Sequence, residues 1–388
     1  MDWNSFLHNS KIKNLSSLLT STILGNAVSA IFWLYLADLL GQESYGELGY
    51  LISIAGITSN VVLVGGEYVM TVYTARNMNI QSVLYLISLV TSGISAIILY
   101  IIFQNIGLSA YVIGFVIFML VISEIQGRKL YQNYAKNFLL QKFFFVFFAF
   151  VLFHIIGEEG ILLGYAFSFL LFSKRMIISL KTKKFNFKFL KTKSGFIANN
   201  YSLDLAGVLR GEIDKLMIAP LFGFGLLGNY YLGLQIVSIL SIIPGVVFTY
   251  LLPRDASGES TKKLRMVTIF SSFVFALIGI FVAPNVLTIL FPQYQESVAL
   301  IPVLSLSVIP ITISSMYTSK FLGEEKSSFV LIAYLLSFIT LVLTILLLSE
   351  KLGVNGLAYA YLLSSTVQAI FLFSMNFFNI SIFRRKNE

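Results

Sequence analysis

Apolar segments of about 20 residues recur along nearly the whole chain and constrain its fold more than any other feature. A helix needs about 20 apolar residues to cross a bilayer, and lipid leaves the polar groups of any open, irregular backbone without partners. The 388 residues have a mean hydropathy of +0.85, and 57% are hydrophobic whereas 12% are charged. These values exclude a water-soluble globular domain. We therefore predict an all-α polytopic membrane protein.

The alternation of apolar runs and polar breaks predicts about twelve transmembrane helices. They cover residues 15–37, 47–72, 80–103, 108–127, 141–157, 160–178, 196–221, 227–252, 266–290, 298–319, 327–349 and 353–378. All the loops on one side of these spans are short.

Positive charge is concentrated in the loops on the other side. Of the 27 lysines and arginines, 24 lie in these loops or at the adjoining ends of the spans, Lys351 lies in a loop on the opposite side, and Arg210 and Lys215 lie inside the seventh span. Basic loops stay in the cytoplasm, so this asymmetry predicts a multi-pass protein of the plasma membrane with both termini cytoplasmic. It also accounts for the net charge of +9 without nucleic acid as a partner.

The longest inward loop divides the chain into two halves. We predict a six-helix lobe at residues 1–178, a basic cytoplasmic linker at 179–195 and a second six-helix lobe at 196–388. The linker interleaves lysines with phenylalanines. It is either a plain positively charged connection or a segment that lies on the anionic inner leaflet and helps to gather an anionic lipid head group.

An internal repeat supports the division into six and six helices. Gly41 and Gly46 in the first half recur as Gly223 and Gly228, each 182 residues later. A second echo, GILLGY from residue 160 and GLAYAY from residue 356, closes each half with a displacement of 196. Two parallel lobes would enclose a central cavity, with the first and seventh spans in equivalent positions beside it.

The seventh span carries five charges, namely Asp204, Arg210, Glu212, Asp214 and Lys215. At about 100° per residue these charges share one side of a helix, and the other side carries Leu205, Leu209, Ile213 and Leu216. Lipid cannot solvate such a charged side, so we expect it to face a water-filled cavity or partner helices. This charged face is the predicted substrate site.

The same charges have a second interpretation, in which they only pair with each other. Arg210 and Asp214 are four residues apart and can form a ladder that holds the bundle together. Buried ion pairs are poor stabilisers, and charges within membranes usually mark a transport path. We therefore favour the cavity, which Asn26, Glu67 and Arg76 of the first two spans would complete. Arg76 can instead anchor the inner end of its helix.

All seven prolines lie in the second half of the chain. Pro244 and Pro310 fall inside the eighth and tenth predicted spans, where proline removes a backbone hydrogen bond and permits a kink. They are either ordinary kinks filled by packing or hinges that bend during a transport cycle.

The residues offer little support for an enzyme. The chain has no cysteine and two histidines, which removes thiolate chemistry and leaves little for a histidine metal cluster. No acid–base pair, metal-ligand spacing or nucleotide-binding loop stands out. We expect no catalytic residues and no cofactor or metal, apart from a coupling ion that would be H⁺ or Na⁺.

Four stretches together resemble a known family of membrane transporters. They read LADLLGQESYGELGYLISIAG, IDKLMIAPLFGFGLLGNYYLGLQIVSIL, FLGEEKSS and GVNGLAYAYLLSS. In this order they resemble the Wzx-type lipid-linked oligosaccharide flippases, also called polysaccharide biosynthesis proteins, of the multidrug/oligosaccharidyl-lipid/polysaccharide (MOP) exporter superfamily. The resemblance runs from about residue 15 to 378 and implies two six-helix lobes and alternating access.

The resemblance also implies a substrate and partners. It implies that a polyprenyl-diphosphate-linked oligosaccharide is flipped to the outer leaflet for surface polysaccharide biosynthesis, beside other polysaccharide-assembly proteins. Arg210 and Lys215 would pair with the diphosphate, and the acids would orient these cations, bind sugar hydroxyls or hold a coupling cation. The family motif carries over to Asp214, Gly223, Gly228 and Tyr230.

Two other functions are weighed against the flippase. The first is a cation-coupled drug or metabolite antiporter of the same superfamily, in which the acids of the seventh span bind the cation. The second is a membrane glycan polymerase or ligase, but no outward loop is long enough to hold a catalytic site. From the sequence we favour the flippase.

Overall fold

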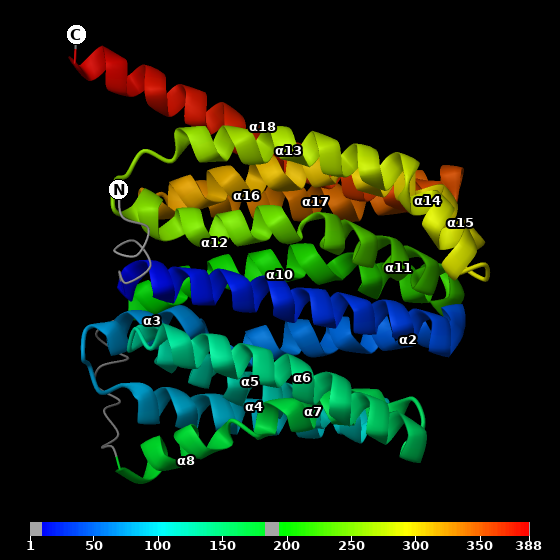
Figure 1. The fold of residues 1–388 in the computed structure, drawn as a ribbon, viewed down its shortest axis with the longest axis horizontal. Coiled ribbons are helices and arrows are strands. Elements are labelled where there is room, and N and C mark those ends of the chain that lie inside the picture. Colours follow the sequence, from blue (N-terminus) through cyan, green and yellow to red (C-terminus); the bar gives the residue numbers. More distant parts are fainter. Residues whose placement is uncertain (1–9, 183–193, 388) are drawn as a thin grey trace. The chain divides into compact units, whose positions relative to one another are not determined.

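The computed structural model describes residues 10–182 and 194–387, and within them it contains helices and no strand (Figure 1). Residues 183–193 of the predicted basic linker lie outside the described residues. The first helices are α2 (Ser10–Leu63), α3 (Gly66–Ala75), α4 (Gln81–Phe103), α5 (Ile106–Gly127), α6 (Tyr131–Ile156), α7 (Glu159–Leu170) and α8 (Ser173–Thr182). They are followed by α10 (Ser194–Phe222), α11 (Phe224–Leu240), α12 (Ile242–Ala256), α13 (Lys262–Phe281), α14 (Ala283–Leu290), α15 (Gln295–Leu306), α16 (Val308–Gly323), α17 (Ser327–Leu352) and α18 (Val354–Asn387).

These helices account for the twelve predicted spans. Within the described residues, seven helices are long and apolar enough to cross a membrane, and three bent helix pairs raise the number to ten. The long helix α2 counts once in that number, although non-helical backbone at Gly41 breaks it into two segments. α10 has 29 residues and is long enough to cross, but its five charges keep it out of the number. The prediction of an all-α polytopic membrane protein is confirmed.

Contacts divide the chain into two compact units. Unit 1 comprises residues 1–32 and 51–208, and unit 2 comprises residues 33–50 and 209–388. The boundaries therefore fall within α2 and α10, whereas the sequence suggested a division at residues 179–195. Residues 33–50 group with the second half of the chain, and residues 194–208 group with the first half.

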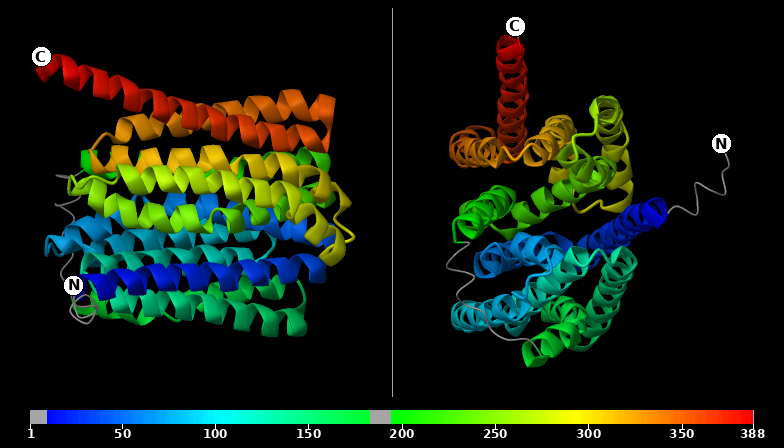
Figure 2. Two further views of the ribbon diagram at one scale, coloured as in Figure 1. Left: turned by 45° about the horizontal axis from the view of Figure 1, so that its top comes forward. Right: turned by 90° about the vertical axis from the view of Figure 1, so that its left-hand side faces the viewer.

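Unit 1 is held together by aromatic packing between its helices. α5 packs against α4 and α7, and α7 packs against α6 (Figure 1, Figure 2). The buried ring of Phe145 on α6 stacks on Tyr165 of α7, with 3.8 Å between ring centroids. Tyr111 of α5 meets the same Tyr165 edge to face. Offset-stacked and edge-to-face pairs add stabilisation beyond the area they bury.

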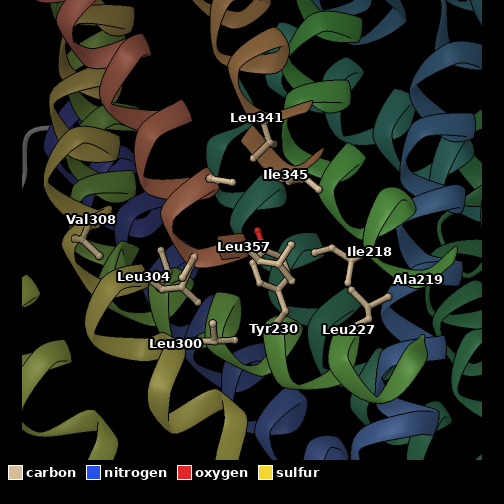
Figure 3. Close-up of a cluster of buried hydrophobic side chains, with 13 residues drawn as sticks. Ile218, Ala219, Leu227, Tyr230, Leu300, Leu304, Val308, Leu341, Ile345 and Leu357 are labelled. Carbon is tan, nitrogen blue, oxygen red and sulfur yellow. The ribbon is translucent and has the colours of Figure 1, made fainter. Parts of the chain in front are cut away.

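Unit 2 has an apolar core to which six helices contribute, with Tyr230 at its centre (Figure 3). Its buried members include Ile218, Leu227, Leu300, Leu304, Val308, Leu341, Ile345 and Leu357. These residues come from α10, α11, α15, α16, α17 and α18. The ring of Tyr230 is 1% exposed, yet its hydroxyl needs a hydrogen-bond partner. That requirement links the core to the polar site described below.

The internal repeat is confirmed in the backbone. Gly41 has φ 72° and ψ 177°, and its equivalent Gly223 has φ 85° and ψ 169°. Residues with a side chain rarely adopt these backbone angles, because only glycine adopts them without steric cost. Each of the two glycines therefore breaks the chain between consecutive helical segments in the same way.

The second pair of repeated glycines marks a close crossing within unit 2. A Cβ atom on Gly46 would overlap the carbonyl oxygen of Phe224, and a Cβ atom on Gly228 would overlap the carbonyl oxygen of Gln42. The two repeat-related segments thus cross backbone to backbone, each through its own glycine. Small residues permit such a close approach of helices in membranes.

The second sequence repeat, which begins at residues 160 and 356, is also present in the helix packing. Gly160 packs against the carbonyl of Leu152, and Gly356 packs against the carbonyl of Leu348, with 196 residues between equivalent positions in both cases. Gly356 thus makes the same backbone contact as its equivalent Gly160. We conclude that the two halves of the chain share this pattern of helix packing.

The helices that contain Pro244 and Pro310 are bent. α11 and α12 meet at 52°, and α15 and α16 meet at 40°. Each proline is the third residue of the helix that follows the break, where its missing N–H removes one backbone hydrogen bond. The hydrogen-bond ladder resumes one residue later, from Gly245 to Ser241 and from Ile311 to Ser307. The predicted kinks are present, and a hinge role for them stays a prediction.

Candidate functional site

The five charges of the seventh span lie on α10, as predicted, but they belong to two different environments. Asp204 lies in the part of α10 that belongs to unit 1, and the other four lie in the part that belongs to unit 2. We call Arg210, Glu212, Asp214 and Lys215 the α10 charge cluster.

Asp214 is the most deeply buried member of the α10 charge cluster, with 1% of the residue exposed. One carboxylate oxygen accepts a hydrogen bond from the Tyr230 hydroxyl at 2.8 Å. The other accepts from the backbone N–H of Lys215 at 2.8 Å and from its Nζ at 3.1 Å. Buried charges are stable in proteins only when they are paired and hydrogen-bonded, and Asp214 meets both conditions.

Lys215 is held by two acids at once. Its Nζ lies 3.1 Å from Asp214 and 3.1 Å from Glu212, and it also donates to the carbonyl of Gly211 at 2.6 Å. Lys215 is 6% exposed, whereas the Glu212 side chain keeps 31% of its surface. The cluster contains two cations and two carboxylates and is therefore electrically neutral without any bound ion.

Arg210 bonds to a different part of unit 2. Its Nε donates to the Ser337 hydroxyl of α17 at 3.0 Å, and Ser337 and Ser364 of α18 bond to each other at 2.7 Å. Tyr361 of α18 lies within electrostatic range of Arg210 and Asp214. Among the described residues, Asp214 is bonded to Lys215 and Tyr230. The i, i+4 ion pair between Arg210 and Asp214 is not among the contacts described.

Four residues of this site have no charge to mark them in the sequence. Tyr230 entered only through the family resemblance, and sequence reasoning missed Ser337, Tyr361 and Ser364. The one available signal is a pair of serines, Ser364 and Ser365, in the middle of an otherwise apolar span. A serine within a membrane span either bonds its own helix backbone or bridges to another helix, and the sequence does not distinguish these cases.

A second polar group, which we call the acidic pair, lies in unit 1 and consists of Glu67 and Asp204. Gly65 turns the chain between α2 and α3 with φ 67°, and its backbone packs against Ile197 and Tyr201 of α10. Glu67 follows in the first turn of α3, so the turn carries it toward α10. The two carboxylates lie within electrostatic range of each other, and both side chains are half-buried.

The remaining predicted cavity residues are not brought to the acidic pair by the described contacts. Arg76 is exposed at the far end of α3, about 13 Å along the helix axis from Glu67, and it lies over the ring of Tyr73. Asn26 is half-buried on α2, one residue after Gly25, which packs against Phe138 of α6. The exposed position of Arg76 at the end of α3 is the one that the anchoring interpretation expects, and a cavity role for Arg76 and Asn26 stays a prediction.

Accessibility along α10 gives a direct test of which side meets water. Gly211 is exposed and has open space around its Cα, and it lies beside the half-buried Glu212. Ile218, two turns later, is fully buried in the core of unit 2. A single cysteine at position 211 is expected to react with a membrane-impermeant thiol reagent, because a carboxylate beside lipid would lack solvation. A cysteine at 218 is expected to stay unlabelled, and labelling at 218 but not at 211 would reverse the assignment.

The described residues contain no group of three or more His, Asp or Glu side chains that converge as a metal site. The acidic pair has two carboxylates. The electrostatic interaction of the two carboxylates favours the uptake of positive charge, but two carboxylates by themselves do not form the multi-ligand cage of a structural metal.

Comparisons with known proteins place the fold. No protein-family model and no curated protein sequence matches the chain. A multidrug resistance MATE family transporter of the MOP superfamily, solved inward-facing, is similar over 96% of this chain and 100% of its own, with 12% identity and a TM-score of 0.73. The outward-facing conformation of such a transporter matches over 98% of each chain with 14% identity and a TM-score of 0.68. The eukaryotic MATE transporter AtDTX14 matches over 94% and 95% of the two chains with 16% identity and a TM-score of 0.63.

These similarities extend over nearly the whole length of both chains. This protein therefore has the multi-pass membrane fold of the MATE transporters of the MOP superfamily. At identities between 12% and 16%, the likeness concerns the fold, and the substrate has to be argued from the residues of this chain.

Proposed function

We propose that this protein is an alternating-access membrane transporter, not an enzyme, that moves an organic solute in exchange for a cation. The observation that carries the proposal is the acidic pair on a fold shared with transporters solved facing inward and facing outward. Carboxylates within membrane spans are expensive and commonly mark ion pathways. Two that are close to each other also favour the uptake of a cation between them.

The neutral α10 charge cluster would serve a different purpose in this transporter. Its four charges balance, and Lys215 already occupies the space between Glu212 and Asp214. A coupling cation therefore has less to gain there than at the acidic pair, where no internal cation is described. Asp204 of the acidic pair and the whole α10 charge cluster lie on one helix, so a cation bound at Asp204 would act on the helix that also carries the cluster. The coupling ion would be H⁺ or Na⁺.

Flipping of a polyprenyl-diphosphate-linked oligosaccharide is the second candidate, and the ordered set of four family-like sequence stretches favours it. In that case Arg210 is the better partner for the diphosphate, because its guanidinium bonds to Ser337 through Nε and keeps other N–H donors. Lys215 is less suited, since two carboxylates already hold its ammonium group. The glycan-assembly partners implied by the resemblance belong to this candidate.

One reconstitution experiment separates the two candidates. Purified protein in sealed vesicles is tested for uptake of a fluorescent organic cation such as ethidium under an imposed proton or sodium gradient. The same preparation is tested for exposure of a polyprenyl-diphosphate oligosaccharide to an external lectin. We expect gradient-dependent movement of the organic cation. Lectin access without any cation exchange would instead favour the flippase.

The acidic pair should control this exchange. Glu67→Gln and Asp204→Asn are each expected to lower gradient-driven uptake at least about tenfold, because each removes half of the negative charge that would hold the cation. Glu159→Gln serves as the matched control, since Glu159 is an exposed acid of unit 1 in the first turn of α7. Full exchange in both pair variants at normal protein abundance would contradict the assignment of the cation site.

A further inference from the structure

Unit 1 has a further polar site, separate from the acidic pair. It lies where the end of α5, the start of α6 and α8 meet. It is a cavity of about 520 Å³, lined by Val121, Glu124, Ile125, Arg128, Asn137, Leu171, Phe172, Lys174, Arg175, Ile178 and Ser179. The chain bends by 46° between α7 and α8, at Leu171 and Phe172, so the bend itself forms part of the lining. We propose that this cavity, which we call the α5–α8 pocket, binds the phosphate of an anionic membrane lipid.

A buried carboxylate holds the two arginines of the pocket in place. Glu124 has 3% of its side chain exposed, and it accepts a hydrogen bond from the Tyr85 hydroxyl at 2.8 Å. Arg128 lies 2.8 Å from the same carboxylate and Arg175 lies 3.6 Å from it. A guanidinium has five N–H donors in a fixed fork, so each arginine keeps donors that a single carboxylate cannot use.

The charge of the pocket is positive after Glu124 has been counted. The lining contains three cations, Arg128, Lys174 and Arg175, against one acid. The two arginine side chains keep 39% and 33% of their surface. Arginine forks match phosphate oxygens in pairs, and basic pockets between membrane helices bind anionic head groups.

A buried hydroxyl without a partner points to the same ligand. Ser179 lines the pocket and is 4% exposed, and its Oγ has no hydrogen-bond partner in the part of the chain that the structure describes. A buried hydroxyl that lacks a partner costs free energy. A phosphate oxygen in the pocket would give it one.

The other lining residues indicate a lipid in preference to a free phosphate. Five of the eleven are apolar, and Leu171 and Ile178 expose 50% and 52% of their surface. A ligand that filled the pocket would therefore place a charged head beside the arginines and an apolar chain along these side chains. All three cations are among the basic residues of the side that the sequence predicts to be cytoplasmic, and the cytoplasmic leaflet is the anionic one.

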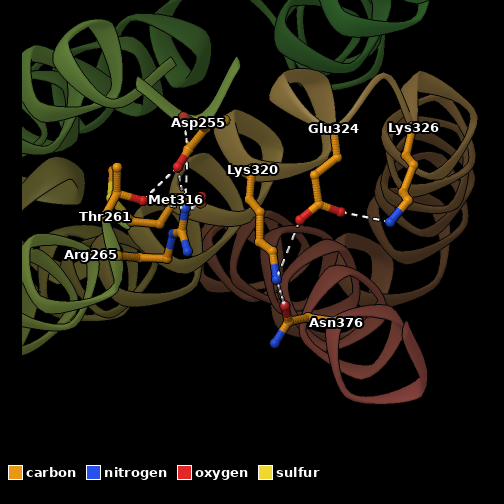
Figure 4. A network of polar contacts seen from close by, with 9 residues as sticks. Asp255, Thr261, Arg265, Met316, Lys320, Glu324, Lys326 and Asn376 are labelled. Atoms are coloured by element: carbon orange, nitrogen blue, oxygen red, sulfur yellow. Dashed lines mark hydrogen bonds and ion pairs between the residues drawn. The ribbon is translucent and has the colours of Figure 1, made fainter. Parts of the chain in front are cut away.

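Unit 2 shows that the fold does not require this charge. Residues 124 and 128 correspond to Lys320 in α16 and to Glu324 directly after its end, so the ion pair of unit 1 recurs 196 residues later with its signs reversed (Figure 4). Lys129 and Glu325, the next equivalent pair, share a φ of 59°. The cavity beside Lys320 and Glu324 is lined by three acids and three cations.

In this unit 2 cavity, the buried charged groups Asp255 and Arg265 bond to each other and to neighbouring residues. Asp255 accepts two hydrogen bonds from one nitrogen of Arg265, at 2.9 and 3.0 Å, and a further one from Ser319 at 2.7 Å. Arg265 also donates to the carbonyl of Met316 (Figure 4). The excess of positive charge is therefore a property of the α5–α8 pocket, and the balanced cavity of unit 2 provides an internal control.

Binding is tested with the full chain, purified and delipidated in a neutral detergent. The thermal unfolding midpoint is followed while one of three probes is added: dihexanoyl phosphatidylglycerol, dihexanoyl phosphatidylcholine or glycerol phosphate. We expect a saturable rise in the midpoint with phosphatidylglycerol only. An equal rise with phosphatidylcholine would overturn the anionic site, and an equal rise with glycerol phosphate would assign it to a free phosphate.

Variants locate the effect in the pocket. Lys174→Gln together with Arg175→Gln is expected to weaken the apparent affinity for phosphatidylglycerol at least about tenfold, because two cations near the head group are lost. Lys262→Gln together with Lys263→Gln removes the same charge beside the unit 2 cavity and should leave the affinity unchanged. Lys174→Gln alone gives a milder variant in case the double variant folds poorly. Wild-type affinity in the pocket variants would overturn the proposal, which does not depend on the proposed transport function.

Discussion

Replacing Asp214 by alanine is expected to lower the free energy of unfolding by about 3–5 kcal/mol, the cost of breaking a buried ion pair by removing one partner. The carboxylate is 1% exposed and binds Lys215 on one side and the Tyr230 hydroxyl on the other. Without it, the Lys215 ammonium keeps only Glu212 as an ionic partner, and the Tyr230 hydroxyl loses its acceptor in an apolar core. A shift in the denaturant or thermal midpoint of the purified protein measures the effect.

Two matched variants separate charge from shape at this position. Asp214→Asn keeps the side-chain volume and one acceptor oxygen, so it should cost less than alanine while still leaving Lys215 under-compensated. Glu212→Gln removes the other carboxylate of the cluster, whose side chain is 31% exposed, and is expected to cost about 1 kcal/mol or less. A loss for Glu212→Gln as large as that for Asp214→Ala would mean that burial does not determine the energetics of this cluster.

The burial of Asp214 also shows where sequence reasoning about the site succeeded and where it stopped. Helical periodicity identified all five charges of α10 and placed them within one span, because a helix of known pitch relates neighbouring positions directly. It did not indicate that Lys215 would be enclosed by two acids, or that Arg210 would bond to Ser337, 127 residues away. Such partners depend on how α17 and α18 pack against α10, and one helix's own pattern contains no information about that packing.

The acidic pair illustrates the same limit from the other side. Glu67 was selected as a polar residue in an apolar span, and Asp204 as one charge among five. Their proximity follows from the turn at Gly65, which packs against α10. Arg76 looked equally suitable in the sequence, yet it lies at the opposite end of the ten-residue helix α3. Residue type selected the candidates, and a backbone turn decided which of them meet.

The fold was more predictable than the site because its main constraints are local or repeated. Span length follows from bilayer thickness, so the twelve apolar runs translate directly into helices. The repeated glycines carried information about packing as well, since Gly41 and Gly223 adopt the same unusual backbone conformation. The bend between α7 and α8 has no proline to mark it and could not be anticipated.

Gly228→Ala is expected to be among the most disruptive single-methyl substitutions in unit 2, with a loss of about 3 kcal/mol or more in unfolding free energy. The added Cβ would overlap the carbonyl oxygen of Gln42, which is a backbone atom and cannot turn aside as a side chain can. Gly225→Ala is the matched control, since Gly225 lies one turn earlier in α11 with open space around its Cα. There the helix propensity of alanine should stabilise by about 0.5–1 kcal/mol.

The repeat supplies a sharper version of this test. A Cβ on Gly46 would meet the carbonyl of Phe224 at the same crossing, so Gly46→Ala should cost about as much as Gly228→Ala. Either added methyl group alone forces the two segments apart. In the double variant, the second methyl group therefore occupies space that the first has already opened. The double variant is therefore expected to lose clearly less stability than the sum of the two single losses. Strict additivity would show that the two glycines act at separate places and would contradict a shared crossing of the repeat-related segments.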